Sequence, residues 1–379
     1  MSLVPSEEQR QFADTAREFL RDHAPVTAFR QLRDSRDPLG YSMDLWSRMA
    51  ELGWAGITIP EQYGGLDFGF AGMGLLLQEC GRTLAASPLF ATCVLGAGAV
   101  QLAGNDAQKD EILPLVATGE LRLALALEES HRHAPAGVAM SAVRNAGGWR
   151  LNGVKQFVAD GNSAERLVVV ARTGGKPGEE QGLSLFLVDT GAPGVERSRL
   201  SLLDSRNAAR VIFNEVQLEA GSLLGEEGNA WPVLAQVLDR GRAALSAEML
   251  GGAEECFDRT VAYLKQREQF GAVIGTFQAL QHRAAQMFAE LELFRTAVRA
   301  ACDAVDTNAA MVPMLASLAK ARANDGAELI TNEAVQLHGG IGTTDELDIG
   351  LFLKRSRVCM QLLGDSAFHR DRYARLRGF

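Results

Sequence analysis

The chain has 379 residues, of which 47% are hydrophobic and 22% are charged. This length allows two or three compact units, and the composition argues against extended disorder. The formal net charge of −9 argues against a nucleic-acid partner, because phosphate backbones select clustered lysine and arginine.

We expect neither a membrane span nor a signal peptide. No apolar run approaches the ~20 residues that a transmembrane helix needs. The first ten residues, MSLVPSEEQR, lack the basic and apolar regions of a signal peptide, so a cytoplasmic location is expected. The five cysteines lack metal-ligand spacing, which indicates reduced, mostly buried thiols and no metal site. They are Cys80, Cys93, Cys256, Cys302 and Cys359.

Residues 1–118 are predicted to form an N-terminal α-helical domain. Ser6-Glu7-Glu8-Gln9 has the pattern of a capping box, and apolar residues follow it at helical spacing. Further helical patterns are separated by proline and glycine. They cover 43–52, 69–82, 90–103 and 106–113.

Residues 119–227 are predicted to form a middle β domain. Short β-rich runs alternate there with glycine, proline and asparagine, a spacing typical of a small β-sandwich or barrel-like sheet. The runs cover 122–127, 149–151, 167–171, 184–188 and 210–213.

Residues 228–379 are predicted to form a C-terminal four-helix bundle. The helical patterns cover 231–266, 277–305, 309–338 and 345–376. The sequence thus predicts an α+β multidomain protein in which a β domain separates two helical domains.

A distinctive corner joins the first two predicted helices of this bundle. It lies in residues 263–281, YLKQREQFGAVIGTFQALQ. Gln269-Phe270-Gly271 forms a turn, because glycine tolerates positive φ. It follows Arg267, whose planar fork can reach a phosphate. Phe277 and Gln278 are expected to face back toward the turn. From spacing alone, a capped corner with core aromatics is the alternative to a ligand site.

The string R-x-Q-F-G-x-x-I-x-x-F-Q in this corner resembles the flavin-contacting corner of the acyl-CoA dehydrogenase family. The stretches 53–57 (GWAGI) and 60–65 (PEQYGG) resemble that family's N-terminal signature, and the resemblance covers nearly the whole chain. It implies the family's architecture of helical, β and four-helix domains, with FAD as the cofactor.

Two motifs of the middle domain are expected to face the flavin. WRLNGVKQFVA at 149–159 resembles the strand that covers the isoalloxazine ring, so the resemblance assigns Phe157, Val158 and Ala159 to the cofactor. Core packing is the alternative for Phe157, which takes the place usually held by tryptophan. Leu127 stands in a second flavin-contacting stretch, although the Gly-Ser-Asp loop usual after it is replaced here by HRHAPAG at 131–137.

Two motifs of the bundle resemble contacts to the FAD diphosphate of a neighbouring subunit. The first comprises Arg267, Gln269, Phe270, Phe277 and Gln278. The second comprises Gln336, Gly339 and Gly340, although the glycines alone could form a helix C-cap. The resemblance therefore implies an oligomer, either a homodimer or homotetramer or an assembly with a homologous subunit.

The usual catalytic carboxylate is expected to be missing. Family chemistry removes the α proton of an acyl-CoA thioester, which requires a base and a polarised carbonyl. Alignment through residues 354–357 places leucine and glycine, Leu363-Gly364, on the usual Glu-Gly pair, and a second base position falls on Gly241. Asp365 is the nearest carboxylate and the candidate base, with a helix N-cap as its alternative role. Asp239 and Arg242 are assigned to the polar end of the substrate.

Three functions follow from the resemblance. The first is an FAD-dependent acyl-CoA dehydrogenase that passes electrons to an acceptor such as an electron-transfer flavoprotein. The second is a base-less subunit that completes the flavin site of a base-bearing partner. The third is a flavin oxidase or hydroxylase on the same scaffold, which could dispense with the α-proton base.

Overall fold

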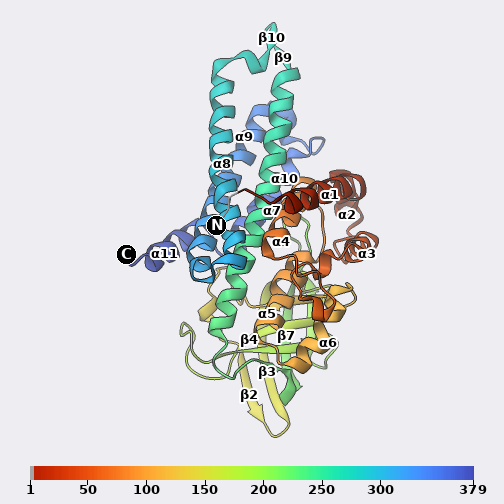
Figure 1. The fold of residues 1–379 in the computed structure, drawn as a ribbon, viewed down its shortest axis with the longest axis vertical. Helices are drawn as coiled ribbons and strands as arrows, with labels where there is room; N and C mark the ends of the chain where they lie inside the picture. The colour runs from red at the N-terminus through yellow and green to blue at the C-terminus, as the bar shows by residue number, and fades with distance from the viewer. Residues whose placement is uncertain (1–3) are drawn as a thin grey trace. The chain divides into compact units, whose positions relative to one another are not determined.

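The computed structural model describes residues 4–379 and divides into two units. The sheet unit comprises Leu32–Gly69 and Ala86–Gly241. The helical unit comprises the residues up to Gln31 together with Phe70–Ala85 and Arg242–Phe379. The predicted architecture of two helical regions around a β region is confirmed (Figure 1).

An eight-stranded mixed sheet forms the centre of the sheet unit, in the order β6-β7-β3-β2-β4-β5-β8, with β1 parallel to β4. Strands β4 and β5 are almost wholly buried, as their continuous apolar sequences require. The strands are β1 (Leu123–Ala126), β2 (Ser141–Asn145), β3 (Gly148–Ala159), β4 (Arg166–Arg172), β5 (Leu183–Asp189), β6 (Val195–Arg199), β7 (Ala208–Glu219) and β8 (Leu223–Leu224).

The sheet unit also contains helices. They are α3 (Met43–Glu51), α5 (Ala97–Ala103) and α6 (Asp106–Ala117), together with α2 (Val26–Ser35), which crosses the unit boundary. The predicted helix over 90–103 is a π-helix at Leu89–Gly96 followed by α5. A Cβ added to Gly96 would lie only 2.3 Å from the Cβ of Leu123 in β1, which is closer than two such atoms can approach. Glycine is therefore required at position 96.

The helical unit is built from long helices. They are α1 (Glu7–His23), α4 (Phe70–Thr83), α7 (Trp231–Gln266), α8 (Gln278–Thr307), α9 (Val312–His338), α10 (Ile349–Gln361) and α11 (Ser366–Leu376), with α7 beginning in the sheet unit. A hairpin of β9 (Glu268–Gln269) and β10 (Ala272–Val273) joins α7 to α8 (Figure 1). The predicted capping box of α1 is confirmed, since Ser6 and Gln9 exchange hydrogen bonds.

The prediction of one helix over 345–376 is wrong. The chain forms α10 and α11, separated by residues 362–365. Leu363 and Gly364 have φ values of 59° and 111°, which a right-handed helix cannot contain. Asp365 then caps α11, because its side chain accepts a hydrogen bond from the amide of Phe368 at 2.8 Å. We call residues 362–365 the α10–α11 break.

All five cysteines are buried thiols, as predicted. Within residues 4–379, no cluster of three or more histidine, cysteine or acidic side chains is arranged to hold a metal ion. None of the described helices is long and apolar enough to cross a membrane.

Candidate active site

A β-bulge turns Phe157 out of the sheet. The pairing of β3 with β7 shifts between Lys155 and Val158, and Phe157 has φ 51°. A bulge of this kind re-aims a side chain. The phenyl ring is 40% exposed, whereas Val158 is buried. The alternative of a core role for Phe157 therefore does not fit, and the ring is available to a ligand.

A buried lysine ties Leu127 to this bulge. Nζ of Lys155 donates to the carbonyl of Leu127 at 3.0 Å and to Glu129 Oε1 at 2.7 Å. The amide of Gln156 donates to the carbonyl of Glu128 at 2.7 Å. Burial lowers the pKa of Lys155 to about 8, although Glu129 opposes this shift. The two predicted flavin-contacting stretches of the sheet unit thus lie side by side.

The hairpin between α7 and α8 gathers the corner residues of the helical unit. Phe270 and Gly271 both have positive φ at its tip, and Phe270 is 94% exposed. The rings of Phe270 and Phe277 have centroids 6.4 Å apart in an edge-on arrangement. The Arg267 guanidinium forms no hydrogen bond or ion pair with any described residue. Gln269 and Gln278 are also exposed.

The glycine motif lies at the same end of the helical unit. The ring of Tyr263, near the end of α7, stacks 4.4 Å from the ring of His338, the last residue of α9. Gly339 follows with φ 66°, and a Cβ on Gly339 or Gly340 would meet no atom within 4 Å. Gln336 is exposed beside them. Both predicted motifs of the bundle therefore present exposed donors and open backbone at one end.

Side chains of α7, α9 and α11 fix the carbonyl groups at the α10–α11 break. The Leu363 carbonyl lies 3.0 Å from Nε2 of the buried His369 and accepts a hydrogen bond from Nε of the buried Arg242 at 3.3 Å. The Gly364 carbonyl accepts from Lys320 Nζ at 3.2 Å. A Cβ on Gly364 would lie 2.6 Å from the ring of Phe368, so glycine is required there.

The amide groups at this break, unlike the carbonyls, lack hydrogen-bond partners in the described chain. Neither the Leu363 nor the Gly364 amide has an acceptor within the described chain. Both residues are buried, and buried amides without a partner are rare in native proteins. Such groups can donate to an oxygen of a bound ligand.

The remaining predicted residues lie on α7 and at the start of α11. Asp239 is buried and belongs to the sheet unit, whereas Arg242 belongs to the helical unit. The guanidinium of Arg242 also lies 5.4 Å from the ring centroid of Phe368. Asp365 is exposed, and its Oδ1 accepts the capping hydrogen bond.

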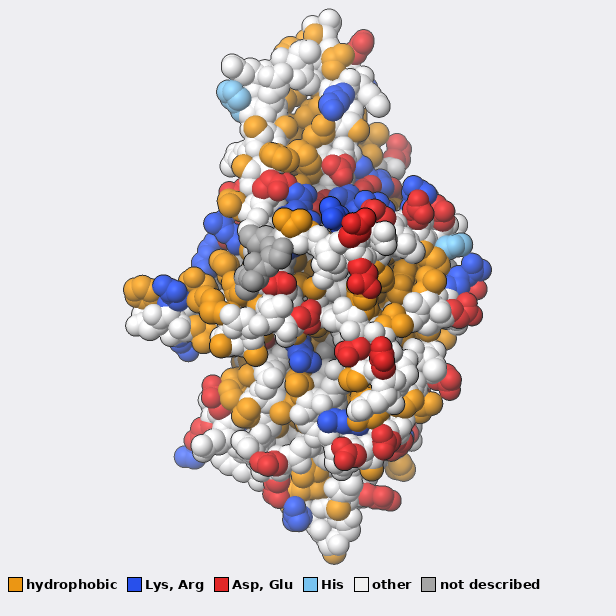
Figure 2. Space-filling model, in the orientation of Figure 1, with side chains coloured by type: hydrophobic (Ala, Val, Ile, Leu, Met, Phe, Trp, Pro, Cys, Tyr) orange, Lys and Arg blue, Asp and Glu red, His pale blue; other side chains and the backbone are white. Residues whose placement is uncertain are grey.

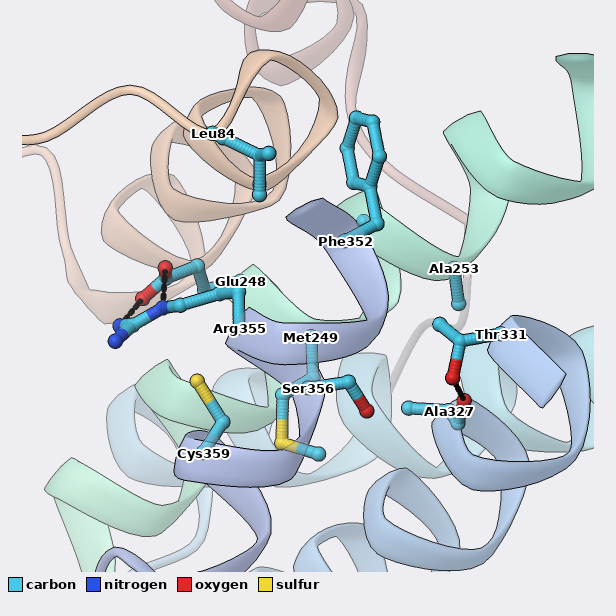
Figure 3. A pocket seen from close by; sticks show the side chains of 12 residues that line it. Leu84, Glu248, Met249, Ala253, Ala327, Thr331, Phe352, Arg355, Ser356 and Cys359 are labelled. Carbon is cyan, nitrogen blue, oxygen red and sulfur yellow. Dashed lines mark hydrogen bonds and ion pairs between the residues drawn. The ribbon is translucent and has the colours of Figure 1, made fainter. Parts of the chain in front are cut away.

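A small pocket lies beside α10 in the helical unit (Figure 3). Its lining is mostly apolar and includes Met249, Phe352 and Cys359, which is four residues before Leu363. Glu248 and Arg355 form a bidentate ion pair at 2.8 and 2.9 Å on one side. The buried Ser356 hydroxyl has no hydrogen-bond partner in the described chain.

Four residues near the predicted site residues were not predicted from the sequence: Lys320, Lys155, His369 and Ser356. A signal exists for Lys320, which interrupts the alanine-rich run Ala316–Ala327 of α9 at a position where helical spacing predicts burial. A signal exists for Lys155 as well, because the alternation of β3 places it on the same face as the buried Trp149 and Leu151. No local pattern distinguishes His369 or Ser356.

Comparison with known proteins identifies all three regions. Models of the acyl-CoA dehydrogenase N-terminal, middle and C-terminal domains match residues 6–120, 124–219 and 228–376. Mitochondrial isovaleryl-CoA dehydrogenase of Pongo abelii is 31% identical over 360 residues, which cover 93% of this chain and 84% of that protein.

Solved structures agree with this match. A "Tcur3481-Tcur3483 steroid ACAD" is 32% identical with a TM-score of 0.87, covering 98% of both chains. An FAD complex of PigA is 25% identical with a TM-score of 0.92, covering 100% of this chain and 99% of that one. The chain therefore belongs to the acyl-CoA dehydrogenase family of oxidoreductases, which act on the CH–CH bonds of acyl-CoA thioesters.

Proposed function

We propose that this protein is an FAD-dependent acyl-CoA dehydrogenase that oxidises the α,β bond of an acyl-CoA thioester. The observation that carries the proposal is the Leu363 amide, a buried donor without an acceptor in the described chain. Such an amide would polarise the thioester carbonyl and stabilise the negative charge that develops on its oxygen.

The residues of the described chain fit a flavin nucleotide. The exposed ring of Phe157 would shield a flat aromatic system from water. The unpaired guanidinium of Arg267 would bind a diphosphate, and the open backbone at Gly339 and Gly340 would allow close approach. When bound, FAD would accept the hydride that leaves the β carbon. An electron-transfer flavoprotein is the proposed acceptor of the electrons.

The two groups of site residues in the helical unit lie far apart in one chain. Arg242 stands near the first third of α7, and Arg267 follows its last residue. At ~1.5 Å per residue they are about 38 Å apart along the helix axis, more than the length of a 20-residue helix. This separation supports the proposal that the hairpin of one chain serves the flavin of another.

Asp365 is the proposed base. Its Oδ1 caps α11, so the second carboxylate oxygen would have to accept the α proton. Leu363 and Gly241 are proposed to replace the two usual glutamates, because an aliphatic side chain and glycine have no group that accepts a proton.

An anaerobic flavin-bleaching screen against acyl-CoA thioesters tests this proposal. Bleaching by at least one thioester is expected, and Asp365→Asn should slow it by a factor of about 100 or more, as expected for loss of a general base. FAD-bound protein that no thioester bleaches would contradict the dehydrogenase function. Bleaching that is unchanged in Asp365→Asn would remove Asp365 as the base.

A second candidate function is a subunit that completes the flavin site of a base-bearing partner. It is favoured by Leu363 at the position expected for the base and by the two-protein name of the 32% identical steroid ACAD. Co-expression with a homologue that carries the glutamate should then give a mixed oligomer with activity that neither chain has alone. A homo-oligomer with full flavin occupancy and turnover would count against this function.

A further inference from the structure

Lys320 of α9 is a completely buried ammonium group whose contacts converge on the α10–α11 break. Its Nζ donates to Asn324 Oδ1 at 2.6 Å, to the carbonyl of Cys359 at 2.9 Å and to the carbonyl of Gly364 at 3.2 Å. An ammonium has three N–H donors and no acceptor. Three oxygen acceptors therefore match the charged form of the lysine.

The arrangement is not an ordinary ion pair. Among residues 4–379, no carboxylate forms an ion pair with Lys320. Burying a charge without a counter-ion is unfavourable unless its hydrogen bonds are satisfied. The carbonyl of Cys359 lies in the last turn of α10, where the helix dipole favours a cation. The fold thus buries an amine that is costly to protonate and uses it to bind backbone carbonyls.

The two carbonyls lie on opposite sides of Leu363. Cys359 belongs to α10 and Gly364 to the break, so one ammonium joins the end of the helix to the turn that follows it. Asn324 supports the same turn, because its Nδ2 donates to the Gly364 carbonyl at 3.4 Å. Peptide groups are planar, so these contacts also fix the planes that carry the Met360 and Asp365 amides and thereby hold the chain on both sides of Leu363.

Leu363 itself needs such support. Its φ of 59° is unfavourable for a residue with a Cβ and costs about 1 kcal/mol or more unless the surroundings impose it. This conformation determines where the Leu363 amide points. Contacts that hold both sides of Leu363 therefore control the direction of the unpaired donor.

We infer that Lys320 is a positioning residue, which holds the α10–α11 break so that the Leu363 amide points at the oxygen of the bound thioester. This inference rests on the proposed dehydrogenase function for the identity of the ligand. The holding of the break itself does not depend on turnover, so the two can be tested separately.

Amide hydrogen exchange tests the first part without substrate. Lys320→Met keeps the approximate length of the side chain and removes the three donors. We expect faster exchange in peptides covering 358–369 of the holoenzyme, because local opening becomes easier. Thr260→Val is the matched control, since its buried hydroxyl bonds only to Cys256 of its own helix. Unchanged exchange at 358–369 in Lys320→Met would overturn the inference.

Kinetics test the second part. A donor that acts on developing charge should affect kcat more than KM. We expect kcat for flavin reduction to fall by roughly ten- to a hundredfold in Lys320→Met, with KM nearly unchanged and Thr260→Val close to wild type. Faster exchange with unchanged kcat would overturn the positioning role. Wild-type protein that reduces no flavin would instead refute the proposed function, while the exchange result would still be valid.

A second variant, Asn324→Ala, tests the same inference if Lys320→Met does not fold. Asn324→Ala removes one acceptor of Lys320 and one donor to Gly364, with a smaller change in buried charge. It should raise exchange at 358–369 and lower kcat in the same direction by a smaller factor. If Asn324→Ala changes neither, the inference fails.

Discussion

A buried lysine holds the backbone next to predicted site residues in each unit. Lys155 and Lys320 are fully buried, and each donates to backbone carbonyls next to predicted site residues. Lys155 has the carboxylate of Glu129 beside it, whereas Lys320 has only neutral acceptors. Burial lowers the pKa of Lys155 to about 8 and that of Lys320 to about 7. Both lysines thus fix the backbone beside predicted site residues, although neither belongs to a motif that predicts this role.

Lys320 should make folding stability depend on pH. Burial is the main cause of its lowered pKa, and Arg242 adds to it, while Cys359 and Asp365 oppose it. An unfolded lysine keeps a pKa of ~10.4. Between pH 7 and that value the unfolded chain binds more protons, so the free energy of unfolding should rise with pH, by up to about 1.4 kcal/mol per pH unit.

Urea unfolding from pH 7 to 10 measures this effect as the difference between wild type and Lys320→Met. Lys265→Met serves as the control, because Lys265 is exposed. The rise with pH should be smaller in Lys320→Met and unchanged in Lys265→Met. Equal slopes in wild type and Lys320→Met would contradict the prediction.

Ser356→Ala should stabilise the protein. The Ser356 hydroxyl is buried without a partner in the described chain, and its desolvation is therefore uncompensated. Removing it should raise the free energy of unfolding by about 1 kcal/mol. Thr331→Val is the matched comparison, because the Thr331 hydroxyl donates to the Ala327 carbonyl at 2.7 Å. That variant should lose up to about 1 kcal/mol in the same chemical denaturation experiment.

At the scale of elements, predicted site residues stand at two interruptions of regular structure, one in each unit. The bulge in β3 exposes Phe157, and the break between α10 and α11 leaves the buried Leu363 amide without an acceptor in the described chain. Both use a non-glycine residue with positive φ, which a regular strand or helix cannot contain. Such backbone conformations persist only when their surroundings impose them.

The capping role of Asp365 can be separated from its proposed role as base. Asparagine caps a helix about as well as aspartate, whereas alanine does not. Asp365→Ala should therefore lower the free energy of unfolding by about 1 kcal/mol, and Asp365→Asn should leave it nearly unchanged. Thermal unfolding followed by circular dichroism measures both. Equal destabilisation by the two variants would show that the charge, rather than the cap, stabilises α11.

At the scale of the whole molecule, the arrangement of α7 predicts that flavin retention requires assembly. The hairpin end of the helical unit presents exposed apolar side chains, including Phe270, Phe277 and Phe288. Figure 2 shows hydrophobic side chains with few charged ones on the part of this unit that carries the hairpin. A surface of this composition is typical of an interface between subunits.

Arg267→Ala should weaken flavin binding without unfolding the chain. The guanidinium has no partner in the described residues, so its loss should not affect stability, while a charge-assisted contact to phosphate is worth about 1.5–3 kcal/mol. Flavin absorbance after gel filtration, with sedimentation to measure assembly, tests this prediction. Arg10→Ala is the control, because Arg10 is also exposed. Equal flavin retention in both variants would contradict the assignment of Arg267.

Much of the fold could be predicted because hydrophobic periodicity is a local property. The apolar runs of β4 and β5 and the amphipathic pattern of α1 identify their elements directly. Strands β2 and β6 were not predicted, since most of their residues are exposed and carry no apolar signal. The split of the last helix was missed for a different reason, because Leu363 carries the unfavourable φ and leucine is ordinarily a good helix former.

The amino-acid sequence by itself determined the order of helical and β regions, the family and the motifs assigned to the flavin, because these depend on residues close together in the chain. The tertiary structure alone decided that Phe157 points out of the sheet and that Lys320 binds the break. These features result from contacts between α9 and α10 and between β3 and β7, which are distant in sequence. Local patterns cannot encode the direction of an amide, because it is fixed by the packing of several elements around it.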